Sequence, residues 1–181
     1  MAEVFTAPDE GVPPPAAPQD ALGRFLLAWA QLSALGGVVL LALVCLLSTW
    51  SVLGRALFDS PLMGDVEMVQ VACSLAISSF LPYAQMKNAH VIVDFFTHNA
   101  GPRLRAVLDL LAALLLAVVA AWLTWRSAVG AWDTYLSGET SMILGWPQWW
   151  AHLTIAPGFA LLSLCALYTA WGRQQILRGL A

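Results

Sequence analysis

Residues 25–54 read FLLAWAQLSALGGVVLLALVCLLSTWSVLG and lie between Arg24 and Arg55 without a charged residue. A helix needs about 20 mostly apolar residues to cross the hydrocarbon core of a bilayer. At about 1.5 Å per residue, a helix over this stretch is longer than that core, so we expect it to tilt or protrude. The stretch therefore predicts a first membrane-spanning helix.

Three further apolar stretches follow along the chain. They predict helices over residues 67–86, 105–130 and 148–172. The whole sequence is 60% hydrophobic and only 10% charged, whereas soluble domains carry about 25% charged residues. We therefore expect an all-α integral membrane protein, with a membrane domain of four transmembrane helices over residues 25–175.

Individual residues predict details of these helices. Pro82 lies near the end of the second helix and predicts a kink there, because proline cannot donate a helical hydrogen bond. Asp109 follows Arg105 by four residues, which is the spacing of an ion pair on one helix.

The two ends of the chain differ in composition from the membrane domain. Residues 1–24 are rich in proline and acidic residues, which is typical of segments that do not bury enough apolar surface to fold. No basic segment precedes the first apolar run, and that run is too long for a signal peptide. We expect a disordered cytoplasmic tail over residues 1–24, an uncleaved first helix, and a short cytoplasmic tail over residues 176–181.

The basic residues predict the orientation, because loops on the cytoplasmic side carry most of the lysine and arginine. Numbering the two sides of the membrane by the parity of the spans places six basic residues on one side: Arg24, Lys87, Arg103, Arg105, Arg173 and Arg178. The other side holds two, Arg55 and Arg126. We therefore expect both termini and the loop between the second and third helices in the cytoplasm.

A stripe of polar side chains runs along the second helix. Its members are Glu67, Gln70, Ser74 and Ser78. Polar and small residues let helices approach closely and form hydrogen bonds in lipid. The same stripe could line a path for a substrate or an ion, but helix packing is the favoured interpretation.

A second pattern lies between the second and third spans. If residues 89–100 are helical, His90, Asp94 and His98 fall on one face and apolar residues on the other. Such a segment predicts a short amphipathic helix in the membrane interface. Histidine and aspartate are also zinc ligands, but a polar helix face is the favoured interpretation, and we expect no bound metal.

Catalytic patterns are missing from the sequence. The three cysteines, Cys45, Cys73 and Cys165, stand alone in apolar runs, so we expect neither a disulfide nor a cysteine metal site. No nucleophile elbow, phosphate-binding loop or metalloprotease motif occurs. The net charge of −3 gives no support for a nucleic-acid partner. We therefore expect neither an enzyme nor a cofactor.

Three strings carry a resemblance to a known family. The first joins Arg55-Ala-Leu-Phe58 to Gly64-Asp-Val-Glu67, and the second is Lys87-Asn-Ala-His90-Val-Ile-Val-Asp94. The third is Gly138-Glu-Thr-Ser141, followed by Leu144, Trp146, Pro147 and Trp149. In order and spacing, these strings resemble the small membrane subunit of tripartite ATP-independent periplasmic (TRAP) transporters, the DctQ-like family, over roughly residues 25–175.

The resemblance implies a division of labour among three proteins. A periplasmic solute-binding protein delivers a small organic acid, and a large membrane subunit moves it inward with sodium ions. The small subunit binds and scaffolds the large one within the lipid bilayer, which the resemblance implies is the inner membrane of a bacterium. The residues that match the family pattern here are Arg55, Glu67, His90, Asp94, Ser141, Pro147 and Trp149.

Two hypotheses remain open at this point. The first is an accessory subunit of such a transporter, with the sodium ions bound on the large subunit. The alternative is a stand-alone four-helix membrane protein, either a small exporter or a redox carrier. Under the first hypothesis, we expect the acidic residues of the periplasmic loops to help dock the binding protein: Asp59, Asp65, Asp133 and Glu139.

Overall fold

The computed structural model describes residues 20–58, 63–87 and 102–179. It contains the helices α1 (Ala21–Phe58), α2 (Asp65–Met86), α4 (Pro102–Ser137) and α5 (Trp149–Gly179). Each of these four helices is long and apolar enough to cross a membrane, which confirms the predicted four spans. The amphipathic helix expected over residues 89–100 lies outside the described residues.

The helices are longer than the apolar stretches alone predict. Helix α1 begins at Ala21, so residues 21–24 belong to the helix rather than to the tail. The Asp20 carbonyl oxygen accepts a bond from the Arg24 N–H at 3.0 Å, which extends the helical pattern across the predicted boundary. Helix α4 continues to Ser137 because the glycine that ends it, with a φ of 67°, is Gly138.

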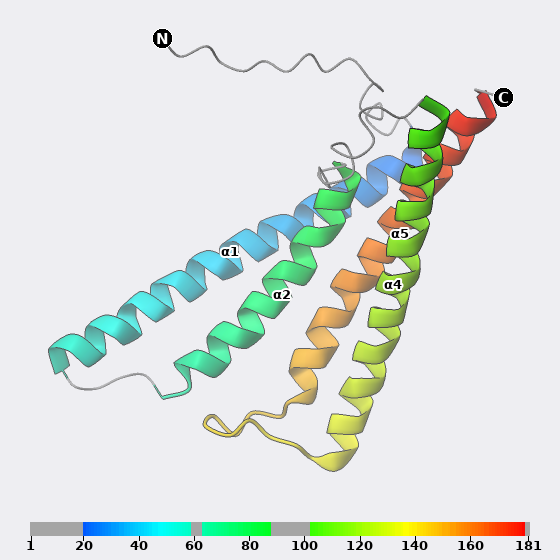
Figure 1. Cartoon of the computed structure of the whole chain (residues 1–181). Helices are drawn as coiled ribbons and strands as arrows, with labels where there is room; N and C mark the ends of the chain where they lie inside the picture. Colours follow the sequence, from blue (N-terminus) through cyan, green and yellow to red (C-terminus); the bar gives the residue numbers. More distant parts are fainter. Residues whose placement is uncertain (1–19, 59–62, 88–101, 180–181) are drawn as a thin grey trace, which may run out of the picture.

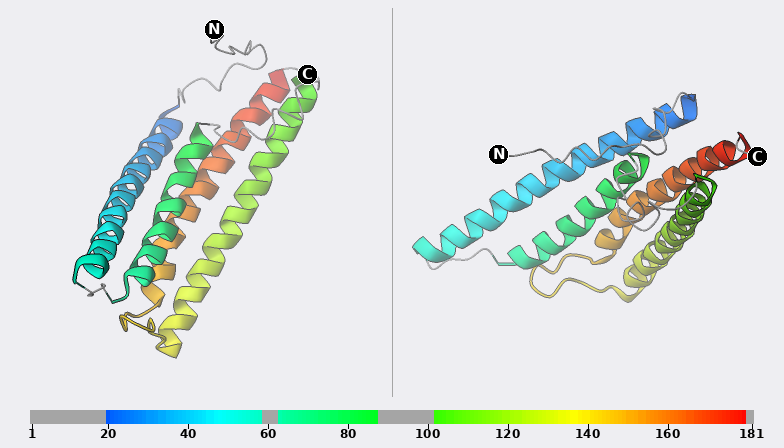
Figure 2. Two further views of the ribbon diagram at one scale, coloured as in Figure 1. Left: turned by 60° about the vertical axis from the view of Figure 1, so that its left-hand side comes forward. Right: turned by 45° about the horizontal axis from the view of Figure 1, so that its top comes forward.

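The four helices stand side by side in the order α1, α2, α5, α4 (Figure 1, Figure 2). Helix α2 packs on α1 and α5, and α4 packs along α5, while α1 reaches α5 only over a short length. The arrangement is therefore close to a single layer of helices rather than a closed bundle. Consequently, no more than a third of the most apolar part of any span is buried within the chain.

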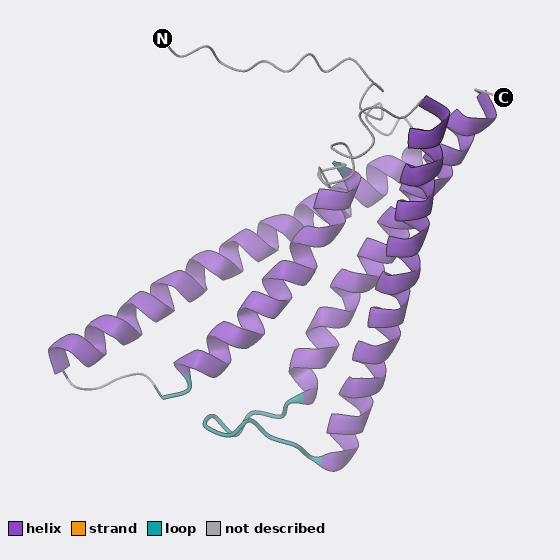
Figure 3. Ribbon diagram, viewed as in Figure 1, coloured by secondary structure: helices purple, strands orange, loops and turns teal. Residues whose placement is uncertain are grey.

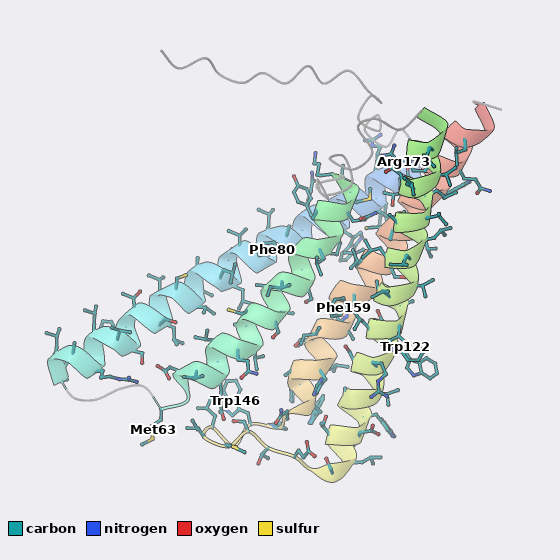
Figure 4. The ribbon with its side chains drawn as sticks, viewed as in Figure 1. Met63, Phe80, Trp122, Trp146, Phe159 and Arg173 are labelled. Carbon is teal, nitrogen blue, oxygen red and sulfur yellow. The ribbon has the colours of Figure 1, made fainter. Side chains whose placement is uncertain are left out.

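Small residues set the spacing between α2 and its two neighbours. A β-carbon at Gly158 of α5 would lie 2.7 Å from the carbonyl oxygen of Ser78 in α2. A β-carbon at Gly37 of α1 would lie 3.0 Å from the ring of Phe80, which is labelled in Figure 4. The Ser33 hydroxyl also donates a hydrogen bond across this contact, to the Ser79 carbonyl oxygen at 3.1 Å. Close approach of backbones is the usual means of helix association in lipid.

Alanine residues form the contact between α4 and α5. The buried positions on α4 are Ala113, Ala117, Ala120 and Ala131, and those on α5 include Leu162, Ala166 and Ala170, while the buried Cys165 of α5 packs on Leu26 and Ala30 of α1. The Ser163 hydroxyl of α5 donates a hydrogen bond to the Ala117 carbonyl oxygen at 3.1 Å. These two helices form the most extensive pair in the molecule.

We call the end of the molecule that holds Ala21 and Gly179 the terminal end (Figure 1). Here the amide nitrogen of Gln85 in α2 donates a hydrogen bond to the Thr169 hydroxyl of α5 at 2.8 Å. Arg173 of α5 lies 3.3 Å from the Asp109 carboxylate of α4, so this acid pairs with a neighbouring helix. The expected partner on its own helix, Arg105, has a side chain outside those described.

Gly158→Ala should destabilise the fold by about 1–3 kcal/mol, because the new methyl group has to displace the α2 backbone at Ser78. Gly172→Ala is the matched control, since a β-carbon at that position on the same helix meets no atom within 4 Å. The midpoint of thermal unfolding in detergent measures both effects. Equal midpoints for the two variants would contradict the close contact between α2 and α5.

Candidate functional site

The most elaborate arrangement of polar groups lies at the end opposite the termini. We call it the loop end; it contains residues 63–64, which precede α2, and residues 138–148, which join α4 to α5 (Figure 3). Three glycines with φ values between 65° and 80° shape these segments: Gly64, Gly138 and Gly145. Such backbone conformations are costly for residues that carry a β-carbon.

Glu67 of α2 holds the 138–148 segment. Its carboxylate accepts hydrogen bonds from the Ser141 hydroxyl, from the Ile143 N–H at 3.1 Å and from the Leu144 N–H at 3.2 Å. All three donors belong to the segment that joins α4 to α5, whereas the carboxylate belongs to α2. Glu67 therefore fixes the connection between α4 and α5 against the beginning of α2.

The 138–148 segment also holds its own shape. The N–H of Ser141 donates to the Trp146 carbonyl oxygen at 2.8 Å. The N–H of Gln148 donates to the Glu139 carbonyl oxygen at 3.1 Å. Thr140 and Pro147 form an isolated antiparallel bridge. A β-carbon at Gly64 would lie 2.5 Å from Leu144, so the glycine also gives this segment room to pack on the start of α2.

A second carboxylate at the start of α2 holds α1. Asp65 accepts a hydrogen bond from the Ser51 hydroxyl at 2.5 Å and from the Val66 N–H at 2.8 Å. The Ser51 side chain is almost fully buried. Asp65 was expected to dock a partner protein, but in the structure its carboxylate joins α1 to α2.

The remaining acidic residues that were expected to dock the binding protein are Asp133, Glu139 and Asp59. Asp133 and Glu139 are exposed, and no side-chain hydrogen bond or ion pair involves them among the described residues. Asp59 lies outside the described residues. Arg55 is exposed near the end of α1.

Exposed apolar side chains surround these acids at the loop end. Met142 is fully exposed, and Met63, Ile143 and Trp146 are more than half exposed. Figure 4 places the labelled Met63 and Trp146 at this end of the molecule. The arrangement is a rigid loop with an apolar, negatively charged outer surface, which suits contact with a partner or with the membrane interface.

The residues of the family pattern have different roles. Ser141 donates to Glu67, Pro147 takes part in the bridge, and Trp149 stacks on Trp150 with ring centres 4.9 Å apart. Trp149 also meets the Tyr135 ring edge-on at 5.7 Å. His90 and Asp94 lie outside the described residues.

The polar stripe of α2 divides into three parts. Ser78 is buried against α5 at Gly158, as helix packing requires. The Ser74 hydroxyl bonds to the Gln70 carbonyl oxygen of its own helix at 2.8 Å, and the Gln70 side chain is exposed. Glu67 bonds to the 138–148 segment. In the described part of the chain, no three histidine, cysteine or acidic residues come close enough to hold a metal ion.

Glu67→Gln should loosen the 138–148 segment, because the amide keeps only one good acceptor for three donors. A lost bond to a charged acceptor costs about 1.5–3 kcal/mol, so the amide hydrogens of Ile143 and Leu144 should exchange at least about tenfold faster. Hydrogen exchange of the protein in detergent measures this rate. Glu139→Gln, on the exposed part of the same segment, should leave it unchanged. Equal exchange rates of the Leu144 amide hydrogen in the unmodified chain, Glu67→Gln and Glu139→Gln would contradict the role assigned to Glu67.

Comparison with known proteins identifies the family of the chain. No curated protein and no solved structure matches the chain. The family model described as tripartite ATP-independent periplasmic transporters, DctQ component, matches residues 44–175. This range covers the last part of α1, all of α2 and α4, and most of α5, and with them the Glu67 and Asp65 contacts. The chain belongs to the DctQ family, the small membrane component of TRAP transporters.

Proposed function

We propose that this chain binds and scaffolds the large membrane subunit of a sodium-coupled TRAP transporter. The transporter takes up a small organic acid that a periplasmic solute-binding protein delivers. The single-layer arrangement of the helices carries this proposal. Because α2 and α5 pack on each other and the layer is one helix deep, most of every span is left uncovered by the chain itself.

The polar groups within the spans favour a scaffold over a transport path. The hydroxyls of Ser33, Ser78 and Ser163 bond to backbone carbonyl oxygens of their own or a neighbouring helix. Polar groups in lipid need such partners, and here they are used for packing. The exposed Gln70 and the half-buried Ser74 of the α2 stripe then face the large subunit.

The basic residues support an orientation of the chain in the membrane. The terminal end holds Arg24, Lys87 and Arg173, and an excess of basic residues favours the cytoplasmic side. The loop end then faces the periplasm of a bacterium. We place the docking surface for the binding protein there, on Glu139 beside the exposed apolar tip of the 138–148 segment.

The full chain should co-purify with the large subunit at a one-to-one ratio in mild detergent. Liposomes that contain both membrane subunits and the binding protein should take up the labelled acid that saturates the binding protein. Liposomes that contain this chain and the binding protein alone should not. Sodium-driven uptake by the latter would contradict the scaffold proposal and favour a stand-alone transporter. Ser74→Leu should lower the amount of large subunit retained without changing the chain's thermal midpoint.

Glu139→Lys should slow uptake by several-fold at low ionic strength and by less at high ionic strength, because exposed charges act mainly on the rate of association. Asp20→Lys, exposed at the terminal end, is the control and should have no such effect. Asp65 is unsuitable for this test, since its carboxylate holds α1. Uptake that is indifferent to Glu139→Lys at every salt concentration would contradict both the docking surface and its periplasmic location.

A further inference from the structure

The outer face of α4 carries a notch between two tryptophans. Trp125, Ala128, Val129 and Trp132 line an open space of about 300 Å³. Their spacing places them on one face of the helix. The two indoles stand two turns apart and the smaller side chains lie between them, which leaves the hollow.

The notch faces away from the other described helices. The side of α4 that meets α5 is formed by Ala117, Ala120 and Ala131. In contrast, the side chains of Trp125 and Trp132 are 69% and 63% exposed. Figure 4 shows Trp122, one turn before the notch, projecting outward from the layer. In a membrane this face meets lipid or another protein.

Two charged residues accompany the tryptophans. Arg126 follows the apolar part of α4, and Asp133 lies seven residues further on, two turns nearer the loop end. Both are exposed. Among the described side chains, the ion pair that forms joins Arg173 to Asp109, so neither Arg126 nor Asp133 is neutralised by a partner there.

We propose that this face binds one phospholipid whose headgroup carries an amine, such as phosphatidylethanolamine. Arg126 holds the phosphate, Asp133 attracts the ammonium group, and the headgroup between them lies along the notch, while the acyl chains follow the apolar residues of α4 toward the middle of the span. The forked guanidinium matches phosphate oxygens, and indoles prefer the level of the headgroups.

The order of the groups along the helix distinguishes a lipid from a protein occupant. From the middle of the span toward the loop end, α4 presents apolar residues, then the cation of Arg126, then the anion of Asp133. A phospholipid of this class presents acyl chains, then a phosphate, then an ammonium group in the same direction. The match holds whichever side of the membrane the loop end faces, so it does not depend on the proposed orientation.

Native mass spectrometry of the delipidated full chain, titrated with phosphatidylethanolamine in detergent, tests the site. The unmodified chain should retain one lipid, and Arg126→Gln should lower the bound fraction about tenfold. Arg55→Gln, which removes another exposed arginine near the loop end, should have no effect. Asp133→Asn should abolish the preference for phosphatidylethanolamine over phosphatidylglycerol, which lacks the amine.

A second pair of variants tests the notch rather than the charge. Ala128→Leu fills the hollow at an exposed position and should lower lipid retention. Ala121→Leu adds the same bulk two turns away on the same exposed face and should not. Co-purification with the large subunit is recorded for each variant.

Three outcomes would overturn the proposal. One is equal lipid retention by the unmodified chain and Arg126→Gln, and another is an equal loss in Arg55→Gln, which means unspecific charge attraction. The third is unchanged lipid binding in Arg126→Gln with loss of the large subunit, which assigns this face to a protein contact instead.

Discussion

The contact between Gly158 of α5 and the Ser78 backbone of α2 joins the two halves of the molecule. Helices α1 and α2 form one pair and α4 and α5 the other, and α1 reaches α5 only over a short length. In lipid there is no hydrophobic driving force between helices, so association depends on close packing and hydrogen bonds. Because glycine has no β-carbon, a glycine that faces a backbone carbonyl lets two helices approach each other closely. The order of the layer therefore depends on this position more than on any apolar side chain.

The first turn of α2 provides the second connection between the pairs. Asp65 reaches the Ser51 hydroxyl in α1, and Glu67 reaches the segment between α4 and α5. Acidic side chains at a helix N-terminus are also favoured by the helix dipole. One turn thus joins every part of the loop end, and a change there disturbs the α1 contact and the 138–148 segment through different residues. At the terminal end, the Gln85–Thr169 contact joins the two pairs, and the Asp109–Arg173 contact joins α4 to α5 within one pair.

The sequence predicts the spans well because hydropathy is a property of single segments. It does not predict which spans are neighbours, because all four have similar apolar surfaces and the deciding contacts involve glycine and alanine. The contact between Glu67 and Ser141 joins residues 74 positions apart, although both belonged to strings typical of the family. Asp109 shows the same limit, since spacing indicates only a partner on its own helix, Arg105, and not the ion pair that Asp109 makes with Arg173 of the neighbouring helix. Asp65 was assigned to a docking surface from its charge and loop position, but its buried partner Ser51 becomes apparent only when α1 and α2 are placed side by side.

A single layer of helices has a consequence for function that a closed bundle does not have. Every span keeps two broad faces open to its surroundings, so partner protein and lipid compete for the same surface. The charged and polar side chains on each face determine whether that face suits a partner protein or lipid. On α2 the exposed Gln70 and the half-buried Ser74 present hydrogen-bonding groups without charge, which suits another helix. On the outer face of α4 the charges of Arg126 and Asp133 stand beside tryptophans at one end of the span, which suits the headgroup region. The broad face at α2 and the outer edge of the layer at α4 are therefore different surfaces, and a scaffold built this way can meet a protein at the first and bind lipid at the second.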